Sequence, residues 1–242
     1  MSVFGYLQSS IFSKVVMAVT GALLVIYIVV HTLGNLLIYL GPDAINSYSQ
    51  FLHSLGPILW IVRIGLIVAA ILHVWTSIAL KLENLDAKPD KYAVKKYLKA
   101  KLTSRTMLWT GVAIFLFVVY HVSHLTLQIT NPEHVSMQAY TPTGLSLAAS
   151  DAMVQFERTN VYNMVVLGFR NPIIAIVYMI AVTIVGFHLN HAIQSMFQTL
   201  GWNNPKYFPI IQKSSTWLSI IIIICLVSIP LTILLGLVGG SV

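Results

Sequence analysis

The stretch Asn171–Gly201, NPIIAIVYMIAVTIVGFHLNHAIQSMFQTLG, decides the fold of this chain. Its first half is continuously apolar, and a helix that spans a bilayer needs about 20 predominantly apolar residues. Two histidines, His188 and His191, follow at a spacing that puts them on one helix face. Because polar side chains inside a membrane are expensive and usually functional, the stretch predicts a spanning helix that carries a site.

The whole chain shares this apolar character. Of its 242 residues, 57% are hydrophobic and 9% are charged, whereas about a quarter of a typical soluble domain is charged. We therefore predict one all-α membrane domain over residues 1–242, an integral bundle of five transmembrane helices at about 15–40, 57–80, 106–129, 172–197 and 217–238. The polar stretches Lys81–Arg105 and Thr130–Asn171 are predicted to be loops.

Basic residues are distributed unevenly between the two faces of the predicted bundle. Those on one face are Lys14, the cluster within 81–105, Lys206 and Lys213; those on the other are Arg63, Arg158 and Arg170. The excess of basic residues predicts a cytoplasmic N-terminus and, after five spans, a C-terminus outside. The segment Lys91–Lys101 would either dock an acidic soluble partner or anchor to anionic lipid headgroups.

Several chemistries are disfavoured by what the chain lacks. Cys225 is the one cysteine, so no intramolecular disulfide and no cysteine-ligated iron–sulfur cluster can form. The predicted spans contain no Asp or Glu, which lowers the case for a clustered zinc or copper site and for a proton-pumping transporter. No nucleic-acid partner is expected.

Histidines are placed in four of the five predicted spans. One such residue could simply hydrogen-bond a neighbouring helix, but four helices with intramembrane histidines call for a shared explanation. The intramembrane histidines are His31, His73, His121 with His124, and His188 with His191; His53 and His134 fall in outer loops and are expected to be solvated.

Two histidines lie far from the basic edge of their spans. His31 follows Lys14 by 17 residues, roughly 26 Å along a helix. His121 follows Arg105 by 16 residues, roughly 24 Å. His31 and His121 are therefore expected at one outer level.

Two others lie nearer the basic edge. His73 precedes Lys81 by 8 residues, roughly 12 Å. His188 precedes Gln198 by 10 residues, roughly 15 Å. His73 and His188 are therefore expected at one inner level.

Two imidazoles that face each other at one depth suit haem b, a planar ligand with two axial positions. Two such levels predict two haems stacked across the bilayer. His124 lies further from the level of His31 than His121 does, which favours His121, whereas depth does not choose between His188 and His191. The unused histidines would bond a haem propionate, a backbone carbonyl or quinone.

The stretches GFHLNHAIQSMFQTLG, MAVTGALLVIYIVVHTLGNLLIYLGPDAINSY and YNMVVLGFRNPIIAIVYMIAVTIVGFH resemble the five-helix, di-haem cytochrome b membrane anchor of succinate:quinone oxidoreductases. The resemblance covers essentially the whole chain. It implies a three-subunit complex in a bacterial cell membrane: a flavoprotein with FAD that oxidises succinate, an iron–sulfur protein, and this anchor. It also implies electron transfer to quinone, usually menaquinone, or the reverse direction with fumarate.

Carried over residue by residue, the resemblance assigns His31 and His121 to the outer haem and His73 and His188 to the inner haem, with His191 as the runner-up in its helix. A quinone pocket is expected near the outer haem, in GPDAINSYSQFLHSLGP and the start of the next span. Its candidate residues are Ser49, Gln50, His53 and Arg63; a hydrated loop is the competing interpretation of this segment.

Two other functions stay open at this point. One is a different di-haem transmembrane reductase that works without succinate-oxidising subunits. The other is a haem-free transporter or anchor whose histidines only pair helices.

Overall fold

A computed structural model of the chain describes residues 9–87, 102–135, 137–140 and 156–240. Five of its helices are long and apolar enough to cross a membrane, which confirms the prediction of an all-α membrane bundle. They are α2 (Ser10–Leu36, extended by a 3-10 turn over Leu37–Leu40), α4 (Pro57–Asp86), α5 (Leu102–His121, extended by a π-helical turn over Val122–Thr126), α7 (Pro172–Thr199) and α8 (Phe208–Leu234).

The ends of the helices differ from the ends of the apolar runs that predict them. The last one begins at Phe208, where the sequence predicts about 217, and ends at Leu234, where it predicts about 238. The first turns of α8 carry polar residues, which a search for apolar runs excludes. A helix nevertheless continues through the headgroup region of the membrane. At the other end, Gly236 adopts a φ of 73°, a conformation that favours glycine and terminates the helix.

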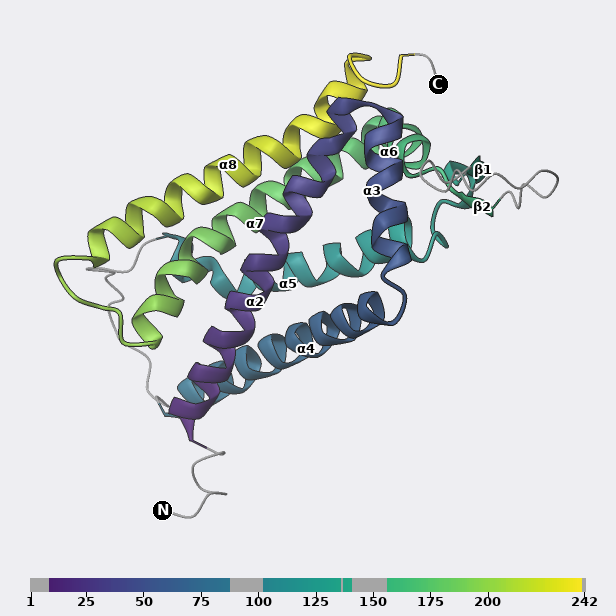
Figure 1. Ribbon diagram of the computed structural model, residues 1–242. Helices are drawn as coiled ribbons and strands as arrows, with labels where there is room; N and C mark the ends of the chain where they lie inside the picture. Colours follow the sequence, from purple (N-terminus) through teal and green to yellow (C-terminus); the bar gives the residue numbers. More distant parts are fainter. Residues whose placement is uncertain (1–8, 88–101, 136, 141–155, 241–242) are drawn as a thin grey trace.

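Helices α2 and α7 lie at the centre of the bundle (Figure 1). α7 packs against α8, α5 and α2, and α2 packs against α4, α7 and α8. In the described part of the chain, α4 packs mainly on α2, and α5 packs mainly on α7. The two helices that are neighbours in sequence, α4 and α5, are thus held by different partners.

Two segments that the sequence predicts to be loops are helices. α3 (Pro42–Ser54) starts with proline at its first turn after Gly41, whose φ is 97°. α6 (Val161–Arg170) lies within the predicted loop Thr130–Asn171 and is capped by Asn160, whose side chain accepts a hydrogen bond from the backbone N–H of Asn163. Both predictions were wrong because these short helices are amphipathic rather than continuously apolar, so a search for spanning runs passes over them.

The same predicted loop also contains a short 3-10 turn, η3 (Pro132–His134), and an antiparallel hairpin. The hairpin pairs β1 (Met137–Tyr140) with β2 (Phe156–Thr159), and Met137 lies opposite Thr159. The other predicted loop, Lys81–Arg105, begins inside α4, because that helix continues to Asp86. The basic segment Lys91–Lys101 falls outside the described residues.

The largest buried cluster lies where α3 and α6 cover one end of the bundle, which we call the α3/α6 end. It includes Ile38, Ile45, Val166, Phe169, Tyr178 and Ile229. A hydrogen bond from Asn46 Nδ2 to Asn160 Oδ1 (3.1 Å) ties α3 to the start of α6. The α3/α6 end is therefore a packed cap and not a set of solvated loops.

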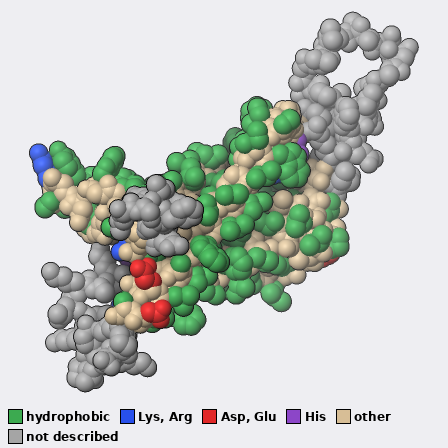
Figure 2. Space-filling model, turned by 90° about the horizontal axis from the view of Figure 1, so that it is seen from below, with side chains coloured by type: hydrophobic (Ala, Val, Ile, Leu, Met, Phe, Trp, Pro, Cys, Tyr) green, Lys and Arg blue, Asp and Glu red, His purple; other side chains and the backbone are tan. Residues whose placement is uncertain are grey.

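The sides of the bundle are apolar on the outside as well. Large exposed hydrophobic side chains occur along all five spanning helices, and they cover most of the face shown in Figure 2. This distribution is that of a protein whose solvent is lipid. A multi-pass membrane protein is the class that the fold defines.

The tightest approach of α7 to α8 occurs at Gly186. A Cβ atom added there would clash with the side chain of Ile223 on α8. We expect Gly186→Val to force the helices apart and to destabilise the bundle by roughly 1–3 kcal/mol, the usual cost of overpacking. Thermal unfolding in detergent measures the effect. Gly65→Val is the matched control, because no atom lies within 4 Å of a Cβ at Gly65; an equal fall in Tm for both variants would contradict this account of the packing.

Candidate functional site

Helices α2 and α5 bring His31 and His121 together. Their ring centroids lie 5.8 Å apart and their planes make an angle of 83°. A metal held between two imidazoles by bonds of about 2 Å each would put the ring centres roughly 6 Å apart. The separation of these two rings therefore fits two axial ligands of one metal, and it is the pair that helix depth predicts.

The surroundings of this pair are aromatic. His31 stacks on Tyr27 at 5.4 Å, and its Nδ1 lies 3.5 Å from the Tyr27 hydroxyl. His121 packs against Phe117 and Tyr178, with centroids 5.7 Å away in both cases. Among the residues that the structure describes, His121 Nδ1 is buried and has no hydrogen-bond partner. Buried polar atoms nearly always have a partner, so this nitrogen differs from the held Nδ1 atoms of the other candidate ligands.

Helix α4 carries His73 and helix α7 carries His188, the two histidines that are expected at the inner level. His73 Nδ1 lies 3.1 Å from the carbonyl oxygen of Met17, and His188 Nδ1 lies 3.0 Å from the hydroxyl of Thr110. In metal sites, the second ring nitrogen of a ligating histidine is commonly held in this way. The arrangement leaves Nε2 of each ring available.

Glycines on the neighbouring helices lie against this second pair. A Cβ at Gly21 would lie 3.2 Å from His73 Cε1, and one at Gly111 would lie 3.7 Å from His188 Cε1. The other glycines of the spans have different surroundings: Gly34 meets Tyr48, and Gly186 meets α8. Gly21 and Gly111 therefore let the backbones of α2 and α5 come close to the candidate ligands His73 and His188.

The donor set of each pair fits haem better than a clustered metal site. Each pair provides two imidazoles from different helices, which matches the two axial positions of a haem iron. Within the described ranges, no three His, Cys, Asp or Glu side chains gather in a way that could hold a metal ion. The chain thus provides two separate two-imidazole sites.

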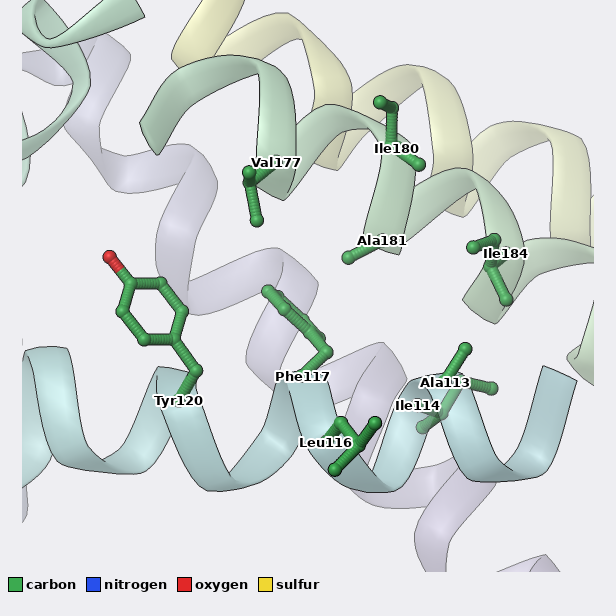
Figure 3. Close-up of a pocket in the computed structure, with 9 residues that line it drawn as sticks. All are labelled: Ala113, Ile114, Leu116, Phe117, Tyr120, Val177, Ile180, Ala181 and Ile184. Atoms are coloured by element: carbon green, nitrogen blue, oxygen red, sulfur yellow. The ribbon is translucent and has the colours of Figure 1, made fainter. Parts of the chain in front are cut away.

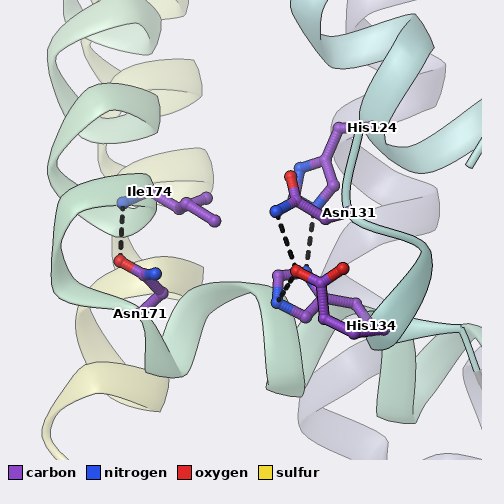
Figure 4. A network of polar contacts seen from close by, with 6 residues as sticks. His124, Asn131, His134, Asn171 and Ile174 are labelled. Atoms are coloured by element: carbon purple, nitrogen blue, oxygen red, sulfur yellow. Dashed lines mark hydrogen bonds and ion pairs between the residues drawn. The ribbon is translucent and has the colours of Figure 1, made fainter. Parts of the chain in front are cut away.

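His124, the alternative to His121 as a candidate ligand, is hydrogen-bonded to two other side chains. It is 1% exposed, its Nδ1 lies 3.0 Å from the Tyr178 hydroxyl, and its Nε2 lies 3.2 Å from His134 Nδ1 (Figure 4). Both ring nitrogens therefore have hydrogen-bond partners. The expectation that His134 is solvated was wrong: its side chain is 12% exposed, because η3 folds back onto the end of α5 and onto α6.

His191, the alternative to His188 as a candidate ligand, is half-buried one turn further along α7. It interacts electrostatically with His188. It therefore lies at the edge of the His73–His188 pair.

The predicted quinone residues lie at the α3/α6 end but do not form one set. His53 is exposed and its Nδ1 bonds the carbonyl oxygen of Ser49 in its own helix (2.8 Å). Gln50 Oε1 is buried with no partner. The guanidinium of Arg63 lies 5.2 Å from the ring centroid of Trp60. Gln50 and Arg63 are thus better placed than His53 to meet a ligand.

Two tyrosines that the sequence analysis did not single out belong to this region. The Tyr27 hydroxyl interacts electrostatically with Tyr48 and Arg63, and Tyr27 also stacks on His31. Tyr27 precedes His31 by one helical turn, and this spacing was the signal in the sequence. Tyr27 connects the predicted quinone region with the His31–His121 pair.

An apolar cavity of about 350 Å³ lies between α5 and α7 (Figure 3). Tyr120 supplies the one hydroxyl among its lining residues. Such a cavity suits an apolar chain, for example a lipid acyl group or the tail of a quinone. Residues that line it include Ala113, Phe117, Tyr120, Val177, Ala181 and Ile184.

Comparisons with known proteins add no family assignment, since no protein-family model, curated protein or solved structure matches the chain. The class that fold and site define is a five-helix membrane protein with two pairs of intramembrane histidines, each pair drawn from different helices.

The hydrogen bond between His188 Nδ1 and the Thr110 hydroxyl provides a test of His188 as a candidate ligand. Thr110→Val keeps the shape of the side chain and removes the hydroxyl partner of His188 Nδ1. Loss of such an outer partner typically weakens metal binding by about 10–100-fold, so we expect haem at the His73–His188 pair to be lost more readily on dilution into apomyoglobin. Thr183→Val is the control, because Thr183 bonds only the carbonyl oxygen of Met179 in its own helix. Identical haem loss from both variants would contradict a positioning role for Thr110.

Proposed function

We propose that the chain is the di-haem cytochrome b membrane anchor of a succinate:quinone oxidoreductase in a bacterial cell membrane. The observation that carries the proposal is the approach of His31 and His121, from two different spanning helices, to ring centroids 5.8 Å apart. The resemblance of GFHLNHAIQSMFQTLG and its neighbours to that family supports it from the sequence.

In this proposal His31 and His121 hold one haem b, and His73 and His188 hold the other. A haem held by each pair would supply one-electron transfer. Tyr27 stacks on His31, while Thr110 and the Met17 carbonyl orient His188 and His73. The chain's own contribution is to fix the four rings and to exclude water around them.

Quinone is proposed to bind at the α3/α6 end, beside the His31–His121 pair. Arg63 donates hydrogen bonds to a quinone carbonyl, and the unpartnered Gln50 Oε1 accepts one from a quinol hydroxyl. Ser49 and His53 lie on the same helix, where His53 Nδ1 bonds the carbonyl oxygen of Ser49. Menaquinone is the quinone that the resemblance implies.

The partners in this proposal are a flavoprotein with FAD that oxidises succinate and an iron–sulfur subunit that relays the electrons. Both dock at the cytoplasmic face, opposite the α3/α6 end, where the loops are basic. An electron that moves outward along this route crosses an inside-negative potential in the favourable direction, by about 2.3 kcal/mol per 100 mV. The succinate chemistry is on the partner subunits, and this chain is the electron-transfer subunit of the enzyme.

A pull-down through a tag on this chain tests the proposal. We expect a flavoprotein and an iron–sulfur protein to co-purify from detergent-solubilised membranes, and succinate to produce the absorption bands of reduced b haem. Malonate, a competitive analogue of succinate, should prevent the reduction. A haem-containing preparation without these partners would instead favour an independent di-haem reductase, and a colourless one would favour a haem-free anchor or transporter.

A further inference from the structure

An ion-pair contact between Glu133 and His134 and a hydrogen bond between His134 and His124 follow one another at the α3/α6 end; Figure 4 shows how His134 and His124 lie. Glu133 is 64% exposed, the side chain of His134 is 12% exposed, and His124 is 1% exposed. Two side-chain contacts thus connect an exposed carboxylate with a fully buried imidazole.

The distances along this line of contacts suit proton exchange. His134 Nε2 lies 3.7 Å from Glu133 Oε1, and His134 Nδ1 lies 3.2 Å from His124 Nε2. A neutral imidazole accepts at one ring nitrogen and donates from the other, so a proton taken up at His134 Nε2 permits release from Nδ1 to His124. A hydrogen bond from Asn131 (3.1 Å) holds the Glu133 carboxylate and lowers the pKa of Glu133, which keeps it ionised beside His134.

The backbone around the two histidines is adapted to bring them together. His124 lies in the π-helical turn Val122–Thr126 that ends α5, and such turns occur frequently at functional sites. On α6, Gly168 leaves space for both rings, because a Cβ there would lie 3.2 Å from His124 Cε1 and 3.6 Å from His134 Nδ1. A larger residue at position 168 would crowd the His124 ring.

The groups that face His124 and His134 come from the elements packed against these two residues. Tyr120 on α5 stacks on His124 at 5.5 Å, and Tyr178 on α7 holds His124 Nδ1. His121 interacts with His124 electrostatically from one turn away. Glu133 is the one acidic side chain among the groups described here, and it lies at the aqueous end of the line.

We propose that Glu133, His134 and His124 form a proton path between the aqueous surface of the α3/α6 end and the interior of the bundle. The inference rests on the proposed function. Reduction of one quinone to quinol takes two electrons, which succinate supplies through the partner subunits, and two protons, which this path draws from the aqueous phase at Glu133. In the opposite direction, the path releases the two protons of quinol to the same side.

Two variants of the intact complex in lipid vesicles test the path. Glu133→Gln removes the exposed carboxylate, and His134→Gln removes the imidazole between surface and interior. We expect both to slow succinate-dependent reduction of a short-chain menaquinone, His134→Gln by at least about tenfold, since positioned acid–base groups typically contribute 10²–10⁴-fold. The haem spectra should stay unchanged. Asp43→Asn is the matched carboxylate control, an exposed residue in the first turn of α3.

Two further readouts separate a proton path from a packing role. Imidazole in the external medium should restore the rate of His134→Gln, which a mere packing defect would not allow. Electrochemically reduced-minus-oxidised infrared spectra should contain bands that shift on ¹⁵N-histidine labelling and that disappear in His134→Gln.

Three results would overturn the inference. One is wild-type quinone reduction in both variants across the pH range while succinate still reduces the haems; this leaves the proposed function intact. Another is a slowed rate that imidazole does not restore, with wild-type infrared bands. The third is a wild-type complex in which succinate reduces no haem, which removes the proposed function together with the path.

Discussion

Replacement of His188 by alanine is expected to remove one of two b haems, whereas replacement of His191 leaves both in place. His188 is the α7 histidine whose Nδ1 lies 3.0 Å from the Thr110 hydroxyl and whose ring lies against Gly111 of α5. His191 lies one turn further along, at the edge of the His73–His188 pair. The haem-to-protein ratio of the purified variants, with the loss assigned by redox titration, measures the difference.

The partner in the same pair provides the check. His73→Ala should lose the same haem as His188→Ala, and the double variant should lose no more than either single variant. If His191→Ala loses a haem while His188→Ala keeps both, the assignment of ligands in α7 is wrong.

Replacement of His121 by alanine is expected to remove the other haem and to stop succinate-dependent quinone reduction. His121 faces His31 across 5.8 Å, and its Nδ1 has no other partner in a buried site. Because the His73–His188 pair is formed by other helices, succinate should still reduce the remaining haem. Stopped-flow absorbance separates this retained step from the lost transfer to quinone.

Phe117→Leu is the control for this variant. Phe117 packs on the His121 ring at 5.7 Å but offers no nitrogen to a metal. The Phe117→Leu variant should retain both haems and quinone reduction. Normal quinone reduction in His121→Ala would show that the His31–His121 pair is not on the route to quinone.

Long apolar runs made the five spans predictable. Lipid contact requires apolar side chains all around a helix over about 20 residues, so the signal for the span at about 172–197 is strong in the sequence alone. The histidine pairs were also predictable in outline, because regular helices convert residue spacing into depth, and His31 does meet His121. Their role as ligands remains a proposal.

The cap at the α3/α6 end was not predictable in the same way. α6 buries residues such as Val166 and Phe169 against α3 and α8, so its helical form depends on tertiary contacts and not on a spanning run. The burial of His134 depends on the fold-back of η3 and on the space at Gly168. Contacts between segments this far apart in sequence leave no mark in hydropathy or spacing.

The quinone region could be predicted from the sequence only in part. The sequence indicated the segment around Gln50 by its polar residues and its position beside the outer level. It did not distinguish the buried, unpartnered Gln50 Oε1 from the exposed His53, because both lie on one helix whose orientation is set by packing on α6. Tyr27 was missed because it lies within an apolar run, where its position one helical turn before His31 does not stand out.

The measurement that tests the central claim most directly is the reduced-minus-oxidised absorption spectrum of the purified chain, combined with haem quantification per polypeptide. The account predicts b-type bands and two haems for each chain, with two redox transitions. A single haem for each chain, or a spectrum without b-type bands, would contradict it.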